Sequence, residues 1–203
     1  MASFRLTSYA EWGARSGDSQ IFDDVHLEIG KKARNPNGKT LGCLGLGSIQ
    51  REVARKAKAL GMRICYYDVA PPPSDVEEAL AAERMDSVHA LAACADCVSV
   101  SGRYLLFLKR DQVSRAHAGT ASLTVPYMDS THHLVDAKFL GAMKSGSRLV
   151  NTSRGPVVDE AALVRALESG HLLSAGLDVH EFEPAVSKEL IKMVRTALPL
   201  VAP

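Results

Sequence analysis

The amino-acid sequence predicts an α/β protein with a doubly wound parallel sheet. Short apolar runs alternate along the chain with segments of helical periodicity, and glycine-rich or polar turns separate them. The run at residues 41–46 has no polar side chain, as expected for a parallel strand that is buried on both faces. With 203 residues, of which 46% are hydrophobic and 23% are charged, the chain is long enough for one sizeable core.

Composition excludes several functional classes. A formal net charge of +1 gives no electrostatic basis for binding nucleic acid or an anionic membrane. No apolar stretch approaches the roughly 18 to 20 residues of a membrane-spanning helix, and the first residues lack the apolar centre of a secretory signal. We therefore expect a cytoplasmic protein that acts on small molecules.

The four cysteines lie in or beside apolar runs, where a reduced thiol packs as a small hydrophobic group. Cys94 and Cys97 have the C-x-x-C spacing of redox and zinc motifs, but no second such pair and no paired histidines complete a metal site. We expect no bound metal and interpret these cysteines as structural.

Residues 1–39 are interpreted as a lead-in helix and linker. The helix is expected because apolar and partly apolar residues recur at helical spacing, and these are Phe22, Val25, His26 and Ile29.

Residues 40–68 have the order of a β-α-β unit that binds a dinucleotide. Leu41–Leu46 is predicted to be a buried strand, and Gly45 and Gly47 permit a tight turn that exposes backbone N–H groups to a pyrophosphate. A helix is predicted next, because apolar residues recur on one of its faces at Val53, Ala57 and Leu60.

Asp68 closes this unit at the end of a second predicted strand, Met62–Tyr67. It lies 21 residues after Gly47, close to the interval of about 20 residues at which an acidic side chain reaches the ribose hydroxyls. A carboxylate accepts hydrogen bonds from the 2′-hydroxyl and repels a 2′-phosphate, and no arginine or lysine occurs from Val69 through Glu83. The sequence therefore favours NAD over NADP.

Three more elements are predicted before residue 101. Ser74 and Glu77 have the spacing of a capping box, which predicts a helix that runs to about Met85. Ser87 is expected to cap a shorter helix, and Asp96–Val100 is predicted to be a strand.

Residues 101–124 interrupt the alternation of strands and helices. Their periodicity is poor, and a structureless segment of this length is unusual inside a compact domain. We interpret them as an atypical insertion, for which three explanations stay open: a lid or partner loop, a surface excursion, or a translated intron.

The alternation resumes after the insertion. Helices are predicted at residues 136–143 and 159–169, and strands at residues 148–151 and 173–179. These strands deliver Arg154 and Glu183 to the carboxyl edge of the sheet, where ligands of α/β proteins bind. From the residues alone, a structural ion pair explains this arginine and glutamate equally well.

Three segments resemble the NAD-binding domain of the D-isomer-specific 2-hydroxyacid dehydrogenases, particularly their glyoxylate and hydroxypyruvate reductase branch. They are GKTLGCLGLGSI, LVNTSRGPVVDEAALVRALESG and AGLDVHEFEP. The resemblance implies a Rossmann-type fold in which Arg154 binds the carboxylate of a 2-oxo acid and Glu183 orients a catalytic histidine. The cofactor-binding residues that it implies are Gly45, Gly47, Ser48, Ile49, Asp68, Pro126, Thr152, Ser153 and Asp178.

The activity implied by the resemblance is that of an NAD-dependent oxidoreductase acting on CH–OH donors. It would reduce a small 2-oxo acid, such as glyoxylate or hydroxypyruvate, by hydride transfer. The family also implies a homodimer, and neither nucleic acid nor a membrane is expected as a partner. The alternative is a non-catalytic module that binds NAD or a partner protein, as in the corepressors that resemble this family.

The sequence departs from the family pattern at four features. Gln50 stands where the fingerprint G-x-G-x-x-G/A has a third small residue, and the insertion adjoins the expected adenine pocket. Leu200 stands where the family has its histidine, and most of the substrate domain is missing. We therefore expect an NAD-binding domain at residues 40–184, a truncated segment at residues 185–203, and impaired catalysis.

Overall fold

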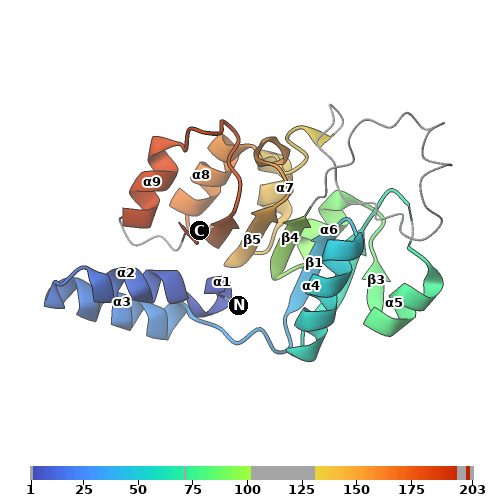
Figure 1. The fold of residues 1–203 in the computed structure, drawn as a ribbon, viewed down its shortest axis with the longest axis horizontal. Helices are drawn as coiled ribbons and strands as arrows, with labels where there is room; N and C mark the ends of the chain where they lie inside the picture. The colour runs from blue at the N-terminus through green and yellow to red at the C-terminus, as the bar shows by residue number, and fades with distance from the viewer. Residues whose placement is uncertain (1, 71, 102–130, 196–199, 202–203) are drawn as a thin grey trace.

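The computed structural model describes residues 2–70, 72–101, 131–195 and 200–201, which form a parallel sheet with helices on both faces (Figure 1). The strands are β1 (Thr40–Leu44), β2 (Arg63–Tyr67), β3 (Ala82–Arg84), β4 (Cys97–Ser101), β5 (Ser147–Thr152), β6 (Leu172–Leu177) and β7 (Leu200–Val201). Their order is β3-β2-β1-β4-β5-β6-β7, and neighbouring strands are parallel. The direction of winding reverses between β1 and β4, so the predicted doubly wound fold is confirmed.

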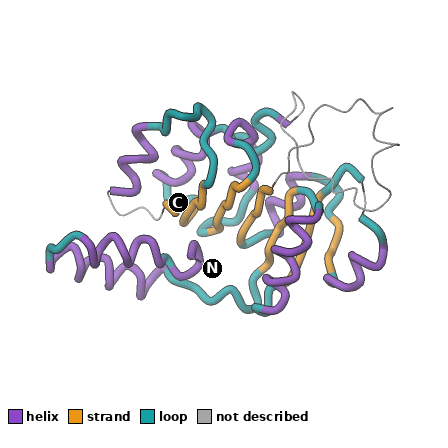
Figure 2. Tube along the Cα trace, viewed as in Figure 1, coloured by secondary structure: helices purple, strands orange, loops and turns teal. Residues whose placement is uncertain are grey.

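Helices divide between the two faces of the sheet (Figure 2). The helices that follow the N-terminal segment are α4 (Ser48–Ala59), α5 (Ser74–Leu80), α6 (Val88–Cys94), α7 (Ala137–Ala142), α8 (Glu160–Glu168) and α9 (Lys188–Arg195), with a 3-10 turn, η3, at Gly155–Val157. One core cluster lies beneath α4 and α5 and includes Leu46, Ala54 and Tyr66. A larger cluster lies beneath α6, α7 and α8 and includes Leu91 and Phe139.

The N-terminal segment contains three helices, α1 (Ala2–Arg5), α2 (Thr7–Arg15) and α3 (Ser19–Lys32), where the sequence predicted one. The predicted helix corresponds to α3, and Asp18 caps it by accepting hydrogen bonds from the first backbone N–H groups. In Figure 1, α2 and α3 form a hairpin that extends from the sheet. A Cβ atom on Gly13 would lie 2.8 Å from Cγ1 of Val25, so the close approach of the two helices requires glycine there.

Several predicted helix starts are confirmed by their caps. Ser87 accepts a hydrogen bond from the N–H of Ala90 at the start of α6. Asp136 and Asp159 cap α7 and α8 in the same way. These caps use residues that are local in sequence, which is why the sequence could predict them.

The prediction of a capping box at Ser74 is wrong. Ser74 is the first residue of α5, and the N-cap position before it is Pro73, which makes no side-chain cap. The Glu77 carboxylate instead accepts a hydrogen bond from the hydroxyl of Tyr66 on β2. The predicted extension to Met85 is also wrong, because the backbone of Ala81 is left-handed and the next residues pair with β2 as the edge strand β3. Two of the three residues of β3, Glu83 and Arg84, are charged and exposed, so this strand lacks the apolar run expected of a buried strand.

Within the described part of the chain, no helix is long and apolar enough to cross a membrane. The same residues contain no group of three or more histidine, cysteine and acidic side chains that could hold a metal ion. Of the expected insertion, Ser101 belongs to β4, and residues 102–124 lie outside the described residues, as does Pro126.

Candidate active site

A glycine turn joins β1 to α4 at the switch point of the sheet. Gly45 has a φ angle of +81° and donates its N–H to the carbonyl oxygen of Tyr67, at a distance of 2.7 Å. Gly47 is the N-cap residue of α4 and makes no side-chain cap, and Ser48 and Ile49 form the first turn of the helix. The backbone N–H groups at this helix end are therefore suited to an anionic group such as a pyrophosphate.

The carboxylate of Asp68 lies against the glycine turn. Its Oδ2 accepts a hydrogen bond of 2.8 Å from the N–H of Leu46, and its Oδ1 accepts one of 3.3 Å from the N–H of Ala70. Each carboxylate oxygen can accept a further hydrogen bond, so Asp68 can still bind ribose hydroxyls. The glycine turn and this carboxylate together fit the pyrophosphate and adenosine ribose of NAD.

Two arginines near the turn were not expected as site residues. The Nε group of Arg51 donates to the carbonyl oxygen of Leu46 at 3.0 Å, and Nη2 of Arg84 donates to the backbone oxygen of Asp68 at 3.3 Å. Arg84 follows directly after residues 69–83, which contain no arginine or lysine. Both guanidinium groups therefore lie close to where the phosphates and the ribose would bind.

Gln50 fills the space between α4 and β4. Its side chain is fully buried, and Nε2 donates a hydrogen bond of 2.6 Å to the carbonyl oxygen of Ser99. The predicted apolar helix face is partly wrong, because Leu60 is 42% exposed and the buried residues are Gln50, Ala54 and Ala57. Gln50 thus links the helix to the sheet through a buried hydrogen bond.

Asn151, near the end of β5, organises the next part of the site. Its Oδ1 accepts hydrogen bonds from the backbone N–H and the hydroxyl of Ser153, at 3.0 and 2.6 Å, and its Nδ2 donates to the carbonyl oxygen of Arg154 at 3.2 Å. Its own carbonyl oxygen accepts the N–H of Asp178, which follows β6, at 3.0 Å. Asn151 was not among the predicted site residues, although its place near the end of a strand before a polar turn is a usable signal.

The side chains predicted at these strand ends occupy the same edge of the sheet. Thr152 ends β5 and forms a hydrogen bond of 2.7 Å with the hydroxyl of Ser101, which ends β4. Arg154 is half-buried, and its Nη1 donates to the carbonyl oxygen of Ser153. The Asp178 carboxylate follows β6 on the exposed surface.

The loops after β5 and β6 pack directly against each other at Gly155. A Cβ atom there would lie 1.8 Å from the carbonyl oxygen of His180, so no other residue permits this contact without a shift of the backbone. The contact brings the loop that carries Arg154 next to the loop that carries Asp178 and Glu183.

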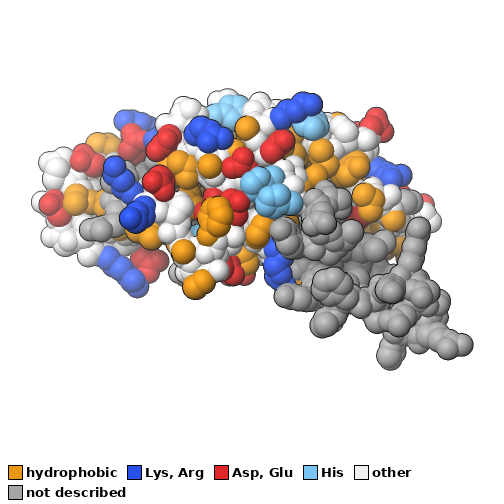
Figure 3. All heavy atoms as spheres, turned by 90° about the horizontal axis from the view of Figure 1, so that it is seen from above, with side chains coloured by type: hydrophobic (Ala, Val, Ile, Leu, Met, Phe, Trp, Pro, Cys, Tyr) orange, Lys and Arg blue, Asp and Glu red, His pale blue; other side chains and the backbone are white. Residues whose placement is uncertain are grey.

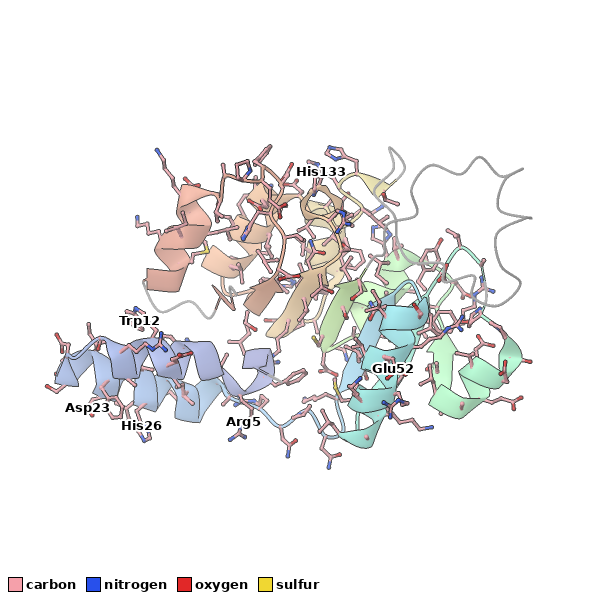
Figure 4. All side chains as sticks on the ribbon, in the orientation of Figure 1. Arg5, Trp12, Asp23, His26, Glu52 and His133 are labelled. Carbon is pink, nitrogen blue, oxygen red and sulfur yellow. The ribbon has the colours of Figure 1, made fainter. Side chains whose placement is uncertain are left out.

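Two glutamates link the same loops, because the carboxylate of each accepts the backbone N–H of the other. Oε1 of Glu160 accepts the N–H of Glu181 at 2.8 Å, and Oε2 of Glu181 accepts the N–H of Glu160 at 3.0 Å. His180 contacts Glu160 at 3.2 Å, and His133 contacts Glu181 at 2.7 Å. Figure 4 shows His133 at the upper edge, and Figure 3 shows histidine and acidic side chains near one another on this face.

Glu183 lies in the loop after β6, where its Oε1 accepts the backbone N–H of His180 at 2.8 Å. The ring of His180 is directed to Glu160, and its side chain is only 12% exposed. Leu200 starts β7 and pairs with Ala175 of β6. That it replaces the histidine of the family stays a prediction.

The structure therefore places most predicted site residues along one edge. Asp68 adjoins the glycine turn after β1, and Thr152, Arg154 and Asp178 follow β5 and β6 with Glu183. Pro126 lies outside the described residues.

Both a protein-family model and individual known proteins match this chain. A model of the family described as "D-isomer specific 2-hydroxyacid dehydrogenase, NAD binding domain" matches residues 9–104 and 112–199. The holo form of D-mandelate dehydrogenase from Rhodotorula graminis is 53% identical, with a TM-score of 0.84 over 100% of this chain and 51% of that chain.

Two curated relatives are each 38% identical. 4-Methyl-2-oxopentanoate reductase A from Aspergillus oryzae is matched over 81% of this chain and 42% of its own length. Glyoxylate reductase 1 from Saccharomyces cerevisiae is matched over 78% of this chain and 38% of its own length. The chain thus spans about half the length of the solved relative, and the matched regions span about two fifths of the curated relatives.

Proposed function

The chain belongs to the D-isomer specific 2-hydroxyacid dehydrogenase family through its NAD-binding domain, and on this premise we propose that it serves NAD-dependent reduction of a 2-oxo acid. The observation that best supports the proposal is that most of the predicted cofactor-binding and substrate-binding residues lie along one edge of the sheet. There, the glycine turn and Asp68 form a dinucleotide cradle, and the loop of Arg154 follows on the strands beyond β4. We assign the NAD-binding unit to residues 40–184.

Each of these residues has a role that its chemistry supports. The glycine turn presents N–H groups to the pyrophosphate, and Asp68 accepts hydrogen bonds from the adenosine ribose. Arg154 pairs with the carboxylate of the 2-oxo acid, because a planar guanidinium can donate two parallel hydrogen bonds to it. Thr152, Ser153 and Asp178 border the nicotinamide half. The bound cofactor supplies the hydride.

The names of two relatives support a proposal of a wider substrate class than glyoxylate and hydroxypyruvate. Two similar proteins are named after mandelate and 4-methyl-2-oxopentanoate, which carry larger apolar substituents. We propose 2-oxo acids of this kind, including phenylglyoxylate, beside the smaller acids. This preference is measured by dividing the kcat/KM for phenylglyoxylate by the kcat/KM for glyoxylate.

A non-catalytic module that binds NAD or a partner is the second candidate. It is favoured by the position of Glu183, which in the described residues bonds a backbone N–H and has no imidazole partner. Catalysis would then be impaired in this chain, while the dinucleotide site is kept. We also propose a cytoplasmic location, which the free state of all four thiols supports, and a homodimer, which rests on the family alone.

The two candidates are separated by titrating the chain with NADH and then adding each 2-oxo acid. Turnover supports the enzyme, binding without oxidation of NADH supports the module, and a lack of NADH binding contradicts both. If turnover is found, Arg154→Lys should lower kcat/KM about 100-fold, because a lysine cannot donate the bidentate pair, while NADH affinity stays the same. Arg55→Lys, on the exposed face of α4, is the matched control and should have no effect.

A further inference from the structure

The fold separates Cys94 from Cys97, its partner in the C-x-x-C spacing. Cys97 and Cys43 belong to the core cluster beneath α4 and α5. Cys65, in the middle of β2, and Cys94, the last residue of α6, belong to the cluster on the opposite face. The two thiols that share an environment are therefore Cys65 and Cys94, which the sequence spacing did not indicate.

The sulfur atoms of Cys65 and Cys94 are 2.8 Å apart, whereas a disulfide bond is about 2.05 Å long. The end of α6 is held tightly in this position. A Cβ atom on Gly42 of β1 would lie 2.8 Å from Cβ of Ala95 and 3.3 Å from Cδ1 of Leu91, so the helix packs directly on the backbone of the strand. The fold thus keeps Cys94 over Cys65.

The two thiols differ in exposure and acidity. Cys94 is half-buried, and Cys65 is 2% exposed. The hydrogen bond with Cys65 lowers the pKa of the Cys94 thiol, and the ammonium group of Lys144 acts in the same direction, against the opposing effect of partial burial. That hydrogen bond and burial raise the pKa of Cys65. Cys94 is therefore the thiol that can be deprotonated and reached by a reagent.

The other two thiols are protected. Burial raises the pKa of Cys43 to about 12 and that of Cys97 to about 11, so both stay protonated at neutral pH. Because the thiolate is the reactive form, neither competes with Cys94 for an oxidant.

We propose that Cys65 and Cys94 form a modification site, a dithiol that hydroperoxides convert reversibly into a disulfide. The Cys94 thiolate attacks one oxygen of hydrogen peroxide, the O–O bond breaks, and the departing hydroxide takes up a proton to leave as water. The Cys65 sulfur then attacks the sulfenic sulfur of Cys94, the S–O bond breaks, and hydroxide leaves with the Cys65 proton as a second water. Two thiols lose two electrons, and one peroxide becomes two waters.

The bond would join α6 to β2, the strand that leads to Asp68. Because the two side chains are already in contact, the strand keeps its register and the affinity for NADH stays the same. The covalent link restricts the unfolded chain between residues 65 and 94, which should raise Tm by about 5–10 °C. The site goes beyond the proposed dehydrogenase function and does not depend on it.

The test treats the reduced full chain with one equivalent of hydrogen peroxide. Thiols titrated in denaturant should fall from four to two, and dithiothreitol should restore four. Mapping of unreduced peptides by mass spectrometry should find the Cys65 peptide joined to the Cys94 peptide. The oxidised protein should show the rise in Tm with no change in NADH affinity.

Single variants identify each partner. Cys97→Ser, the matched control, should still form the bond, and Cys94→Ser should not. In Cys65→Ser, oxidation should stop at the sulfenic acid of Cys94, which dimedone traps. A bond between Cys94 and Cys97, persistence of four thiols, or conversion of Cys94 to sulfonic acid with Cys65 intact would overturn the proposal. The results for the wild type and for Cys97→Ser are sufficient to test the proposal even if another variant does not fold.

Discussion

At the scale of the residue, Asp68 should decide which dinucleotide binds. In Asp68→Asn, the amide oxygen can still accept the N–H of Leu46, so the turn keeps its shape, but the acceptor for the ribose is no longer charged. We expect NADH affinity to fall about 10-fold or more, because hydrogen bonds to a charged group contribute about 1.5–3 kcal/mol. The affinity for NADPH should rise relative to NADH, because a repelling carboxylate is removed beside the guanidinium of Arg84.

Fluorescence titration with both cofactors measures this change in preference. Asp75→Asn removes the same charge from the exposed surface of α5 and is the matched control, which should leave both affinities unchanged. An unchanged ratio of NADH to NADPH affinity in Asp68→Asn would show that Asp68 does not contact the ribose.

The residues found by sequence reasoning are those with a local signal. Asp68 could be predicted because its distance from the glycine turn is set within one β-α-β unit, and Arg154 because it follows a strand in a specific motif. Asn151 and the Glu160–Glu181 pair were not found, because their roles are hydrogen bonds between loops that only the folded sheet brings together. A pattern along the chain carries no signal for such contacts.

At the scale of the element, the position of α4 should depend on Gln50. Removing the side chain in Gln50→Ala leaves a cavity between helix and sheet and leaves the carbonyl oxygen of Ser99 without this donor. We expect a loss of about 2–4 kcal/mol in the free energy of unfolding, from the lost packing and the unsatisfied buried acceptor. Gln50→Gly, which restores the family fingerprint, should be no more stable, because it leaves the same cavity.

Urea denaturation measures these losses. Gln20→Ala, on the exposed surface at the start of α3, is the matched control and should change stability by less than about 0.5 kcal/mol. If Gln50→Gly bound NADH more tightly and unfolded at higher urea than the wild type, Gln50 would be an obstacle to the glycine turn.

The elements that sequence reasoning located are the buried ones. β1, β2, β4, β5 and β6 each contain several buried apolar residues, and the caps and turns beside them are local in sequence. The edge strand β3 was missed, because its three mostly exposed residues carry no apolar pattern and it exists only by pairing with β2. Helices α1 and α2 were missed for a related reason: their apolar residues pack on α3 and the sheet, and no capping residue marks their starts.

At the scale of the whole molecule, Phe4 attaches the N-terminal helices to the sheet, beside contacts of α1 with β6 and β7 and of α2 with β7. Its ring is 4% exposed and belongs to the core cluster beneath α4, and the guanidinium carbon of Arg148 on β5 lies 4.4 Å from the ring centroid. Burial lowers the pKa of Arg148, as expected for a cation taken out of water. The aromatic ring thus joins the first helix to the middle of the sheet and offers a favourable contact to a buried charge.

Replacing this ring should therefore loosen the N-terminal helices from the sheet. We expect Phe4→Ala to lower the free energy of unfolding by about 3–5 kcal/mol, as for a buried phenylalanine, since both the packing and the contact with Arg148 are lost. Hydrogen exchange should accelerate in α2 and α3 more than in β1 and β2, because the helical hairpin depends on this attachment while the strands keep their neighbours. Phe22→Ala, at a ring that is 50% exposed on α3, is the matched control and should cost less than about 1 kcal/mol. Equal losses for the two variants would mean that the sheet holds the N-terminal segment by contacts other than Phe4.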